Sequence, residues 1–98
     1  MRHLYIVAYD VAAPRRLKKV HRIVRDFGDR LQLSVYLCQL SEKELALLRE
    51  RLTDVVNQAH DQVLFVRLAP VRTGDEAAER VDHLGREPYL EDVGAMVY

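Results

Sequence analysis

The sequence contains only one cysteine, Cys38, and this scarcity excludes a disulfide within the chain. A lone thiol is typical of proteins from a reducing compartment. The sequence also lacks any apolar run near the roughly 20 residues that span a bilayer. Its start lacks the long apolar stretch of a signal peptide. These absences predict a cytoplasmic protein without a membrane partner.

The chain has no net charge, which by itself argues against a nucleic-acid partner. The distribution of charge argues the opposite. Residues 1–30 hold eight lysines and arginines against three acidic residues, an excess of five positive charges, and the rest of the chain holds seven against twelve. The sequence therefore predicts a basic element within a neutral protein.

Ninety-eight residues without a repeat, linker or low-complexity tract predict one domain over residues 1–98, with a core in 1–70 and an extension in 71–98. A domain of this size buries somewhat over about 60% of the surface that its unfolded chain exposes. A second copy of the chain would add to its stability, so we expect a homodimer.

The first third of the chain predicts a strand followed by a basic helix. Residues 4–9 are apolar on both faces, as in a central strand covered by helices on at least one side, and Asp10 marks the end of this run. Pro14 suits the first turn of a helix, and Gly28 suits its end. Apolar residues recur between them at three- and four-residue spacing, so the arginines and lysines occupy the other face.

The middle of the chain predicts a long strand, a second helix and a shorter strand. Residues 31–40 alternate apolar and polar side chains without an internal turn signal, which is the period of a half-buried strand. Ser41 and Glu44 match a capping box at the start of a helix that should end within residues 57–61. Residues 63–66 predict a further strand.

The pattern weakens toward the C-terminus. Residues 76–84 predict a short helix, residues 85–88 a turn, and residues 95–98 a terminal strand. We expect this last strand to pair with an edge of the partner chain.

The basic helix indicates a nucleic-acid backbone as a partner. Cations on one helix face can neutralise phosphates and orient a backbone without reading its sequence. The candidates on this helix are Arg15, Arg16, Lys19 and Arg22. Charge alone favours this interpretation no more than it favours a solvated helix face.

Several short motifs together resemble the Cas-two family of CRISPR adaptation proteins. They extend over residues 4–68, and the most specific is the block from Arg30 to Tyr36, in which the family usually has phenylalanine at the position of Tyr36. The matching residues are Tyr9-Asp10-Val11, Arg15-Arg16, Lys19-Val20, Gly28-Asp29-Arg30, Gln32, Ser34-Val35-Tyr36, and Asp61 at the opening of the strand through Phe65.

This resemblance implies an α+β fold, a ferredoxin-like βαββαβ sandwich that forms a homodimer. It also implies that the protein acts with the Cas-one integrase in spacer acquisition. Members of the family are described as metal-dependent nucleases that act on RNA or duplex DNA. The implied element order requires two adjacent strands where the alternation over residues 31–40 predicts one.

The resemblance gives Asp10 a catalytic and metal-binding role. Mg²⁺ is usually bound by one or two carboxylates and keeps several waters. A twofold axis would bring two copies of Asp10 to one such ion, which would then polarise a phosphoryl oxygen and activate a water. The alternative is that Asp10 caps the first helix or turn, which is the commoner role of an isolated aspartate after a strand.

Tyr9, Arg30 and Ser34 complete the predicted nucleic-acid-binding set, although the ring of Tyr9 is more simply part of the core. Tyr36 is predicted to be structural at the dimer interface. The four histidines show no ligand spacing, and Cys38 is most simply a small apolar strand residue.

Two functions of different classes therefore remain. One is a metal-dependent phosphodiesterase, and the other is a non-catalytic dimeric scaffold that holds duplex DNA along its basic helices and presents the integrase at either end. We favour the scaffold as the principal role. A toxin-like ribonuclease of the same fold and a ferredoxin-like binding module are further alternatives, and the Arg30–Tyr36 block argues against both.

Overall fold

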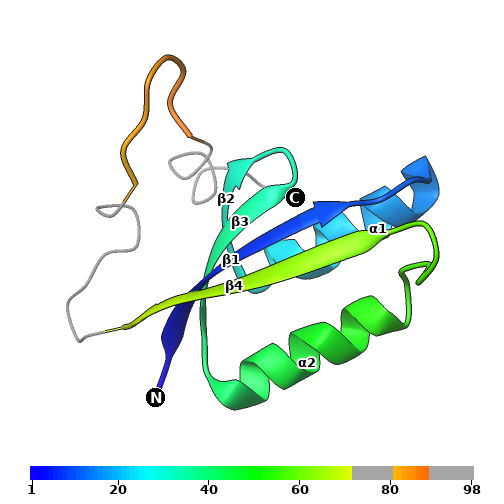
Figure 1. Ribbon diagram of the computed structural model, residues 1–98, viewed down its shortest axis with the longest axis horizontal. Helices are drawn as coiled ribbons and strands as arrows, with labels where there is room; N and C mark the ends of the chain where they lie inside the picture. The colour runs from blue at the N-terminus through cyan, green and yellow to red at the C-terminus, as the bar shows by residue number, and fades with distance from the viewer. Residues whose placement is uncertain (72–80, 89–98) are drawn as a thin grey trace.

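The computed structural model of the chain describes residues 1–71 and 81–88. Its elements are β1 (His3–Asp10), α1 (Pro14–Arg25), β2 (Gly28–Gln32), β3 (Val35–Leu40), α2 (Glu42–Thr53) and β4 (Gln62–Pro70). The strands form one antiparallel sheet in the order β2-β3-β1-β4. Both helices pack on the same side of this sheet (Figure 1). The predicted α+β fold with βαββαβ order is confirmed.

One face of the sheet, here called the helix face, carries the main core. Side chains alternate between the two faces along a strand, so the odd-numbered residues of β1, such as Tyr5 and Val7, point toward the helices. Val20 of α1 and Leu48 of α2 are fully buried against them. Because each helix buries one stripe, the charged side of α1 is directed toward solvent.

The opposite side of the sheet, here called the open face, is only partly covered. Leu4 and Leu37 are buried on this face, where Val71 and Val81 pack against them. Apolar side chains at alternate positions of β4 remain exposed, namely Leu64 (48%), Val66 (46%) and Leu68 (46%). The open face therefore ends in an uncovered apolar row along the edge strand.

The alternating run over residues 31–40 is two strands and not one, as the implied βαββαβ order requires. The chain turns at Leu33 and Ser34, between β2 and β3. Within the described residues, positive φ occurs only at Gly85, so this turn needs no glycine. The carbonyl of Ser34 accepts the N–H of Tyr9 at 3.0 Å, which ties the turn to β1. The contact comes from a distant segment, which explains why no local turn signal is present.

Gly28 does not end the first helix, which corrects that prediction. α1 begins at Pro14 as predicted but ends at Arg25, and Gly28 is the first residue of β2. A Cβ atom at this position would lie 2.4 Å from the Cys38 Sγ and 2.6 Å from the Leu37 carbonyl oxygen. The glycine is therefore required by the close approach of β2 to β3, because any side chain there would clash.

The second helix begins with the predicted capping box. The Ser41 Oγ accepts the backbone N–H of Glu44 at 3.1 Å, and the Glu44 carboxylate accepts the backbone N–H of Ser41 at 2.9 Å. The helix ends at Thr53, earlier than predicted, and β4 extends beyond residues 63–66 in both directions.

Most of the C-terminal predictions lie outside the described residues, including the terminal strand over 95–98 and residues 76–80 of the predicted helix. Residues 81–84 are irregular, so that helix does not extend over them. Gly85 lies in the predicted turn and has a φ of 81°, in the left-handed region that glycine readily adopts. None of the described helices is long and apolar enough to cross a membrane.

Candidate nucleic-acid interface

Asp10 lies at the last position of β1, where it pairs with Gln62 of β4. It is exposed, whereas the preceding residue, Tyr9, is buried on the helix face. Alternation along the strand places Asp10 on the same side as Leu4 and Ile6, which is the open face. The candidate catalytic carboxylate is therefore accessible from the uncovered side of the sheet.

The cations predicted to bind phosphate lie on α1, which begins four residues after Asp10. The exposed members are Arg15, Lys18, Lys19 and Arg22. Val20 and Val24 face the sheet, so these cations project from the outer side of the helix. Three of the four predicted α1 contacts, Arg15, Lys19 and Arg22, are therefore available to a nucleic-acid backbone.

Arg16 differs from its neighbours because it forms an ion pair with Asp61. The Arg16 Nε donates to Asp61 Oδ2 at 2.7 Å, and Nη2 donates to Oδ1 at 3.1 Å. Hydrogen bonds from Arg16 hold the pKa of the Asp61 carboxyl well below its ordinary value, and the same bonds raise the pKa of Arg16. A guanidinium engaged in this way has a structural role in the chain itself.

Tyr9 is 6% exposed and belongs to a cluster of aromatic rings on the helix face. The Nδ1 atom of His21 lies 3.2 Å from the Tyr9 hydroxyl and 3.0 Å from the Tyr36 hydroxyl. The Tyr9 and Tyr36 rings stack with centroids 6.3 Å apart. This geometry supports the core interpretation of Tyr9. It also moves Tyr36 from the predicted dimer interface into the core of a single chain, where it is 1% exposed.

The aromatic cluster is poorly solvated, which changes its ionisation. Burial, followed by the neighbouring Tyr36, raises the pKa of Tyr9 well above its ordinary value. Burial also lowers the pKa of His21, and the charges of Arg30 and Arg25 lower it further. Neutral His21 is therefore favoured near neutral pH.

Arg30 and Ser34 lie on the β2–β3 hairpin. Arg30 pairs with Tyr36 across the two strands, so its side chain is on the helix face with the aromatic cluster. Ser34 is half-buried in the turn, and its backbone carbonyl accepts the N–H of Tyr9. The structure thus brings these two predicted residues toward Tyr9, whose side chain lies on the opposite face of β1 from that of Asp10.

No group of three or more His, Cys, Asp or Glu side chains gathers to hold a metal ion among residues 1–71 and 81–88. Asp10 is therefore not part of a cluster of three or more such side chains among these residues. Cys38 is buried in the core, and burial raises the pKa of its thiol to about 12, which makes it a poor metal ligand or nucleophile. Because Mg²⁺ is usually bound by one or two carboxylates together with water, Asp10 could contribute to such a site but does not by itself define one.

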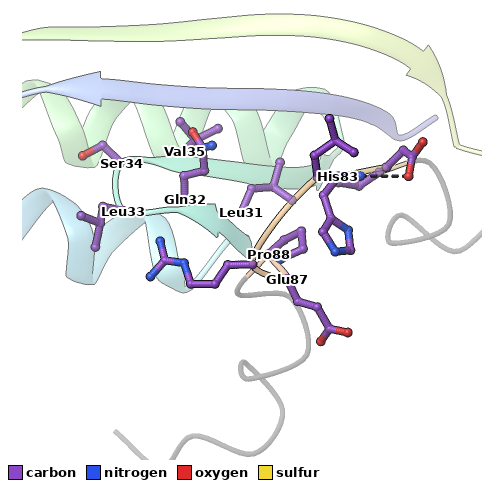
Figure 2. A pocket seen from close by; sticks show the side chains of 12 residues that line it. Leu31, Gln32, Leu33, Ser34, Val35, His83, Glu87 and Pro88 are labelled. Atoms are coloured by element: carbon purple, nitrogen blue, oxygen red, sulfur yellow. Dashed lines mark hydrogen bonds between the residues drawn. The ribbon is translucent and has the colours of Figure 1, made fainter.

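A cavity separates the β2–β3 hairpin from residues 81–88 (Figure 2). Leu31 and Ser34 line it on the hairpin side, and His83 and Glu87 line it on the other. Neither Asp10 nor the cations of α1 border this cavity. The exposed carboxylate and the basic helix therefore form the candidate site, rather than this hollow.

Two parts of this region had not been predicted from the pattern of residues. His21 lies in the basic helix and showed no metal-ligand spacing, yet its ring contacts Tyr9 and Tyr36. Asp61 had been noted only as the start of a strand motif, yet its carboxylate binds Arg16. Both contacts join residues that are distant in sequence, so neither leaves a periodic signal.

The fold and site define a small α+β protein with an exposed carboxylate at the end of β1 and a basic helix directly after it in the chain. The family model described as "CRISPR associated protein Cas2" matches residues 1–73. The CRISPR-associated endoribonuclease Cas2 of Geobacter sulfurreducens is 34% identical over 86 residues, which are 88% of this chain and 87% of that protein. The CRISPR-associated endonuclease Cas2 2 of Thermus thermophilus is 34% identical over 90 residues, 92% of this chain and 90% of that protein.

Solved structures show the same fold. A hypothetical protein from Thermus thermophilus has a TM-score of 0.75 and 31% identity, with 90% of this chain and 96% of that chain covered. Streptococcus pyogenes Cas2, crystallised at pH 6.5, has a TM-score of 0.65 and 30% identity, with 84% and 99% covered. The chain belongs to the Cas2 family, which confirms the resemblance to the Cas-two family in the sequence.

Proposed function

We propose that this protein is a homodimeric, nucleic-acid-binding subunit of CRISPR adaptation that acts with the Cas-one integrase in spacer acquisition. We further propose that Asp10 gives it a Mg²⁺-dependent endonuclease activity on RNA or duplex DNA. The observation that carries the proposal is the exposed Asp10 at the end of β1, followed four residues later by a helix with exposed cations, in a chain of the Cas2 family. The relatives named as endoribonuclease and endonuclease support the cleavage part.

The binding part of the proposal rests on α1. Arg15, Lys19 and Arg22 are exposed on one short helix, so they can contact successive phosphates without contacting bases. Such contacts give affinity that falls steeply with salt and depends little on sequence. This is the behaviour expected of a scaffold that holds many different spacers.

The homodimer is supported by the open face. Leu64, Val66 and Leu68 form an exposed apolar row, and a second copy of the chain would remove it from water. Asp10 lies on the same face as Leu64 and Val66 because these residues share the alternation of paired strands. If a twofold axis packs the two open faces together, both Asp10 carboxylates would lie on the faces that meet.

The metal part of the proposal depends on that dimer. A pair of Asp10 carboxylates, one from each chain, matches the one or two carboxylates that commonly bind Mg²⁺ together with water. When bound, Mg²⁺ would polarise a phosphoryl oxygen and lower the pKa of a water. The cations of α1 would contribute by holding the nucleic acid through its phosphates.

The test compares Asp10→Asn with the wild type and with Asp54→Asn, a control at an exposed aspartate that caps the C-terminus of α2. Cleavage of RNA and of duplex DNA is measured with Mg²⁺ and with a chelator. Replacing a residue that hydrogen-bonds a metal ligand typically lowers metal affinity or activity by about 10–100-fold. Loss of the ligand itself should therefore lower the rate of cleavage by at least about 100-fold. Binding of duplex DNA should persist because the arginines and lysines are intact.

Spacer acquisition with the integrase then separates the two roles. Acquisition that persists in Asp10→Asn while cleavage is lost supports the scaffold as the principal role. Loss of acquisition by a variant that still folds, binds DNA and recruits the integrase would show that the carboxylate is essential to adaptation. Cleavage that survives in Asp10→Asn would overturn the catalytic assignment.

A further inference from the structure

The carboxylate of Asp61 accepts four hydrogen bonds and none of its side-chain surface is exposed. Oδ1 accepts from the backbone N–H of Ala12 at 2.9 Å and from Arg16 Nη2 at 3.1 Å. Oδ2 accepts from Arg16 Nε at 2.7 Å and from the backbone N–H of Asn57 at 2.8 Å. All four partners are hydrogen-bond donors, and each carboxylate oxygen accepts two of them. The donors come from the loop before α1, from α1 and from the segment after α2.

These bonds act on the loop that directly follows Asp10. Ala12 is two residues beyond Asp10, and Asp61 is next to Gln62, the residue that pairs with Asp10 across the sheet. Asp10 and Gln62 form the last pair of their two strands, and terminal pairs open most readily. Asp61 closes the sheet just beyond this pair by joining the exit of β1 to the entrance of β4.

The loop has little to hold it locally. Ala13, at the N-cap of α1, makes no side-chain capping bond, and the first turn of α1 contains no acidic residue. Helix N-termini usually receive an acceptor from a nearby Ser, Thr, Asp or Asn in sequence. Here the acceptor is Asp61, which lies 45 residues beyond Arg16 and binds both the loop before the helix and Arg16 within its first turn.

We propose that Asp61 is a positioning residue: its carboxylate clamps the loop between β1 and α1 to the start of β4 and so fixes the backbone of Asp10. The same clamp fixes the start of α1, and hence the place of Arg15 relative to Asp10. Its effect on catalysis rests on the function proposed above, whereas its effect on backbone order does not.

The sharpest variant is Asp61→Asn, because it keeps the shape of the side chain. An amide has only one oxygen, so its NH₂ group must face two of the four donors whichever way it is turned. Asp54→Asn is the matched control, since it makes the same chemical change at an exposed position. Arg16→Gln is a second variant that leaves Asp61 its bonds to Ala12 and Asn57.

The first measurement is amide hydrogen exchange with ¹⁵N relaxation in the unliganded protein. In Asp61→Asn, exchange at Ala12 should quicken at least tenfold, and order should fall at Asp10. Tyr9, whose N–H is bonded to Ser34, should keep its protection and so report that the sheet is intact. Arg16→Gln should show a smaller change at Ala12, and it replaces Asp61→Asn if that variant does not fold.

The second measurement is cleavage with Mg²⁺. Asp61→Asn should lower kcat at least tenfold with KM for the nucleic acid within twofold of wild type, because the exposed cations of α1 are retained. Asp54→Asn should match the wild type in both constants.

Unchanged order at Asp10 and unchanged exchange at Ala12 would overturn the inference, and so would a disordered loop with wild-type kcat. A wild type whose cleavage is absent or insensitive to Asp10→Asn would instead contradict the proposed nuclease. In that event, the ¹⁵N relaxation of the Asp10 backbone in Asp61→Asn still tests whether Asp61 fixes the position of Asp10.

Discussion

Two pairs of neighbouring residues show how differently the enclosed and exposed sides of this molecule use the same chemistry. Tyr9 and Asp10 are adjacent on β1, yet Tyr9 contacts His21 in the core and Asp10 is exposed on the open face. Arg15 and Arg16 are adjacent on α1, yet only Arg16 is held by Asp61. The side on which a polar group lies therefore decides whether it serves the fold or remains available to a ligand.

On the enclosed side, His21 and Asp61 are held by partners within the chain. His21 and Asp61 each bind two or more groups from other segments, and both have shifted pKa values as a result of burial or of those bonds. Asp10 and the outer cations of α1 remain in solvent, Asp10 on the open face and the cations on the outer side of the helix, and the apolar row on β4 is uncovered. The polar groups that stabilise the fold are therefore enclosed, and the groups of the proposed function are exposed.

The largest effect should come from matched leucine truncations on the two sides. Leu48 is fully buried against the helix face, and Leu64 is 48% exposed on the open face. Leu48→Ala should lower the free energy of unfolding by about 2–5 kcal/mol because it leaves a cavity. Leu64→Ala should lower it by under about 1 kcal/mol at concentrations where the chain is monomeric. Urea denaturation of both variants measures the difference.

Sedimentation of the same two variants tests the open face. Leu64→Ala should weaken dimerisation, whereas the fraction of Leu48→Ala that remains folded should dimerise as the wild type does. Equal losses of unfolding free energy in dilute protein would contradict the contrast between the two sides. A wild-type chain that stays monomeric at micromolar concentration would contradict the homodimer.

The two neighbouring arginines give a smaller and more specific contrast. The sequence alone predicted that Arg15 and Arg16 both contact phosphates. Because Arg16 is held in an ion pair by Asp61, we expect Arg15 and not Arg16 to contact phosphate. Arg15→Ala should reduce the salt dependence of duplex DNA binding by about 0.9 in the slope of log affinity against log salt. Arg16→Ala should leave that slope near wild type and lower stability, because it leaves the shielded Asp61 carboxylate without its charge partner.

Fluorescence anisotropy with a labelled duplex, at salt concentrations from about 50 to about 200 mM, measures both slopes. Thermal unfolding of the two variants provides the accompanying comparison of stability. An equal fall in slope for Arg16→Ala, with the variant folded, would mean that Arg16 leaves Asp61 to contact phosphate in the complex.

The smallest effect concerns pH and the enclosed His21. Its ring faces the hydroxyls of Tyr9 on β1 and Tyr36 on β3, and the charges of Arg30 on β2 and Arg25 on α1 act on it. Its pKa is lower in the folded chain than in the unfolded chain, so the unfolded chain takes up the proton first as pH falls below about 6.5. The free energy of unfolding should therefore decrease from about pH 7.5 to about pH 5.5, the range in which histidine titrates.

Replacing His21 by glutamine keeps a hydrogen-bonding group but removes the titration. Denaturation of His21→Gln over the same range should show a flatter dependence on pH than the wild type. Identical pH dependence in the two proteins would mean that other groups cause the decrease.

The parts of the fold that were predicted correctly depend on contacts near in sequence. The capping box of Ser41 and Glu44 involves residues three apart, and Pro14 starts its helix by its own fixed geometry. The strand-end position of Asp10 followed from the apolar run before it. The turn at Leu33 and Ser34 was missed by the alternation because a backbone bond from Tyr9 supports it, and such a bond leaves no mark on local composition.

The candidate site divides in the same way. The sequence by itself determined which residues are candidates for the chemistry: a carboxylate after a buried strand and a basic face on the next helix, in an order typical of one family. The tertiary structure alone decided which of them are available, because burial and partner choice depend on where distant segments meet. Asp61 lies 45 residues beyond Arg16, and only the antiparallel pairing of β1 with β4 brings its carboxylate to the loop after Asp10.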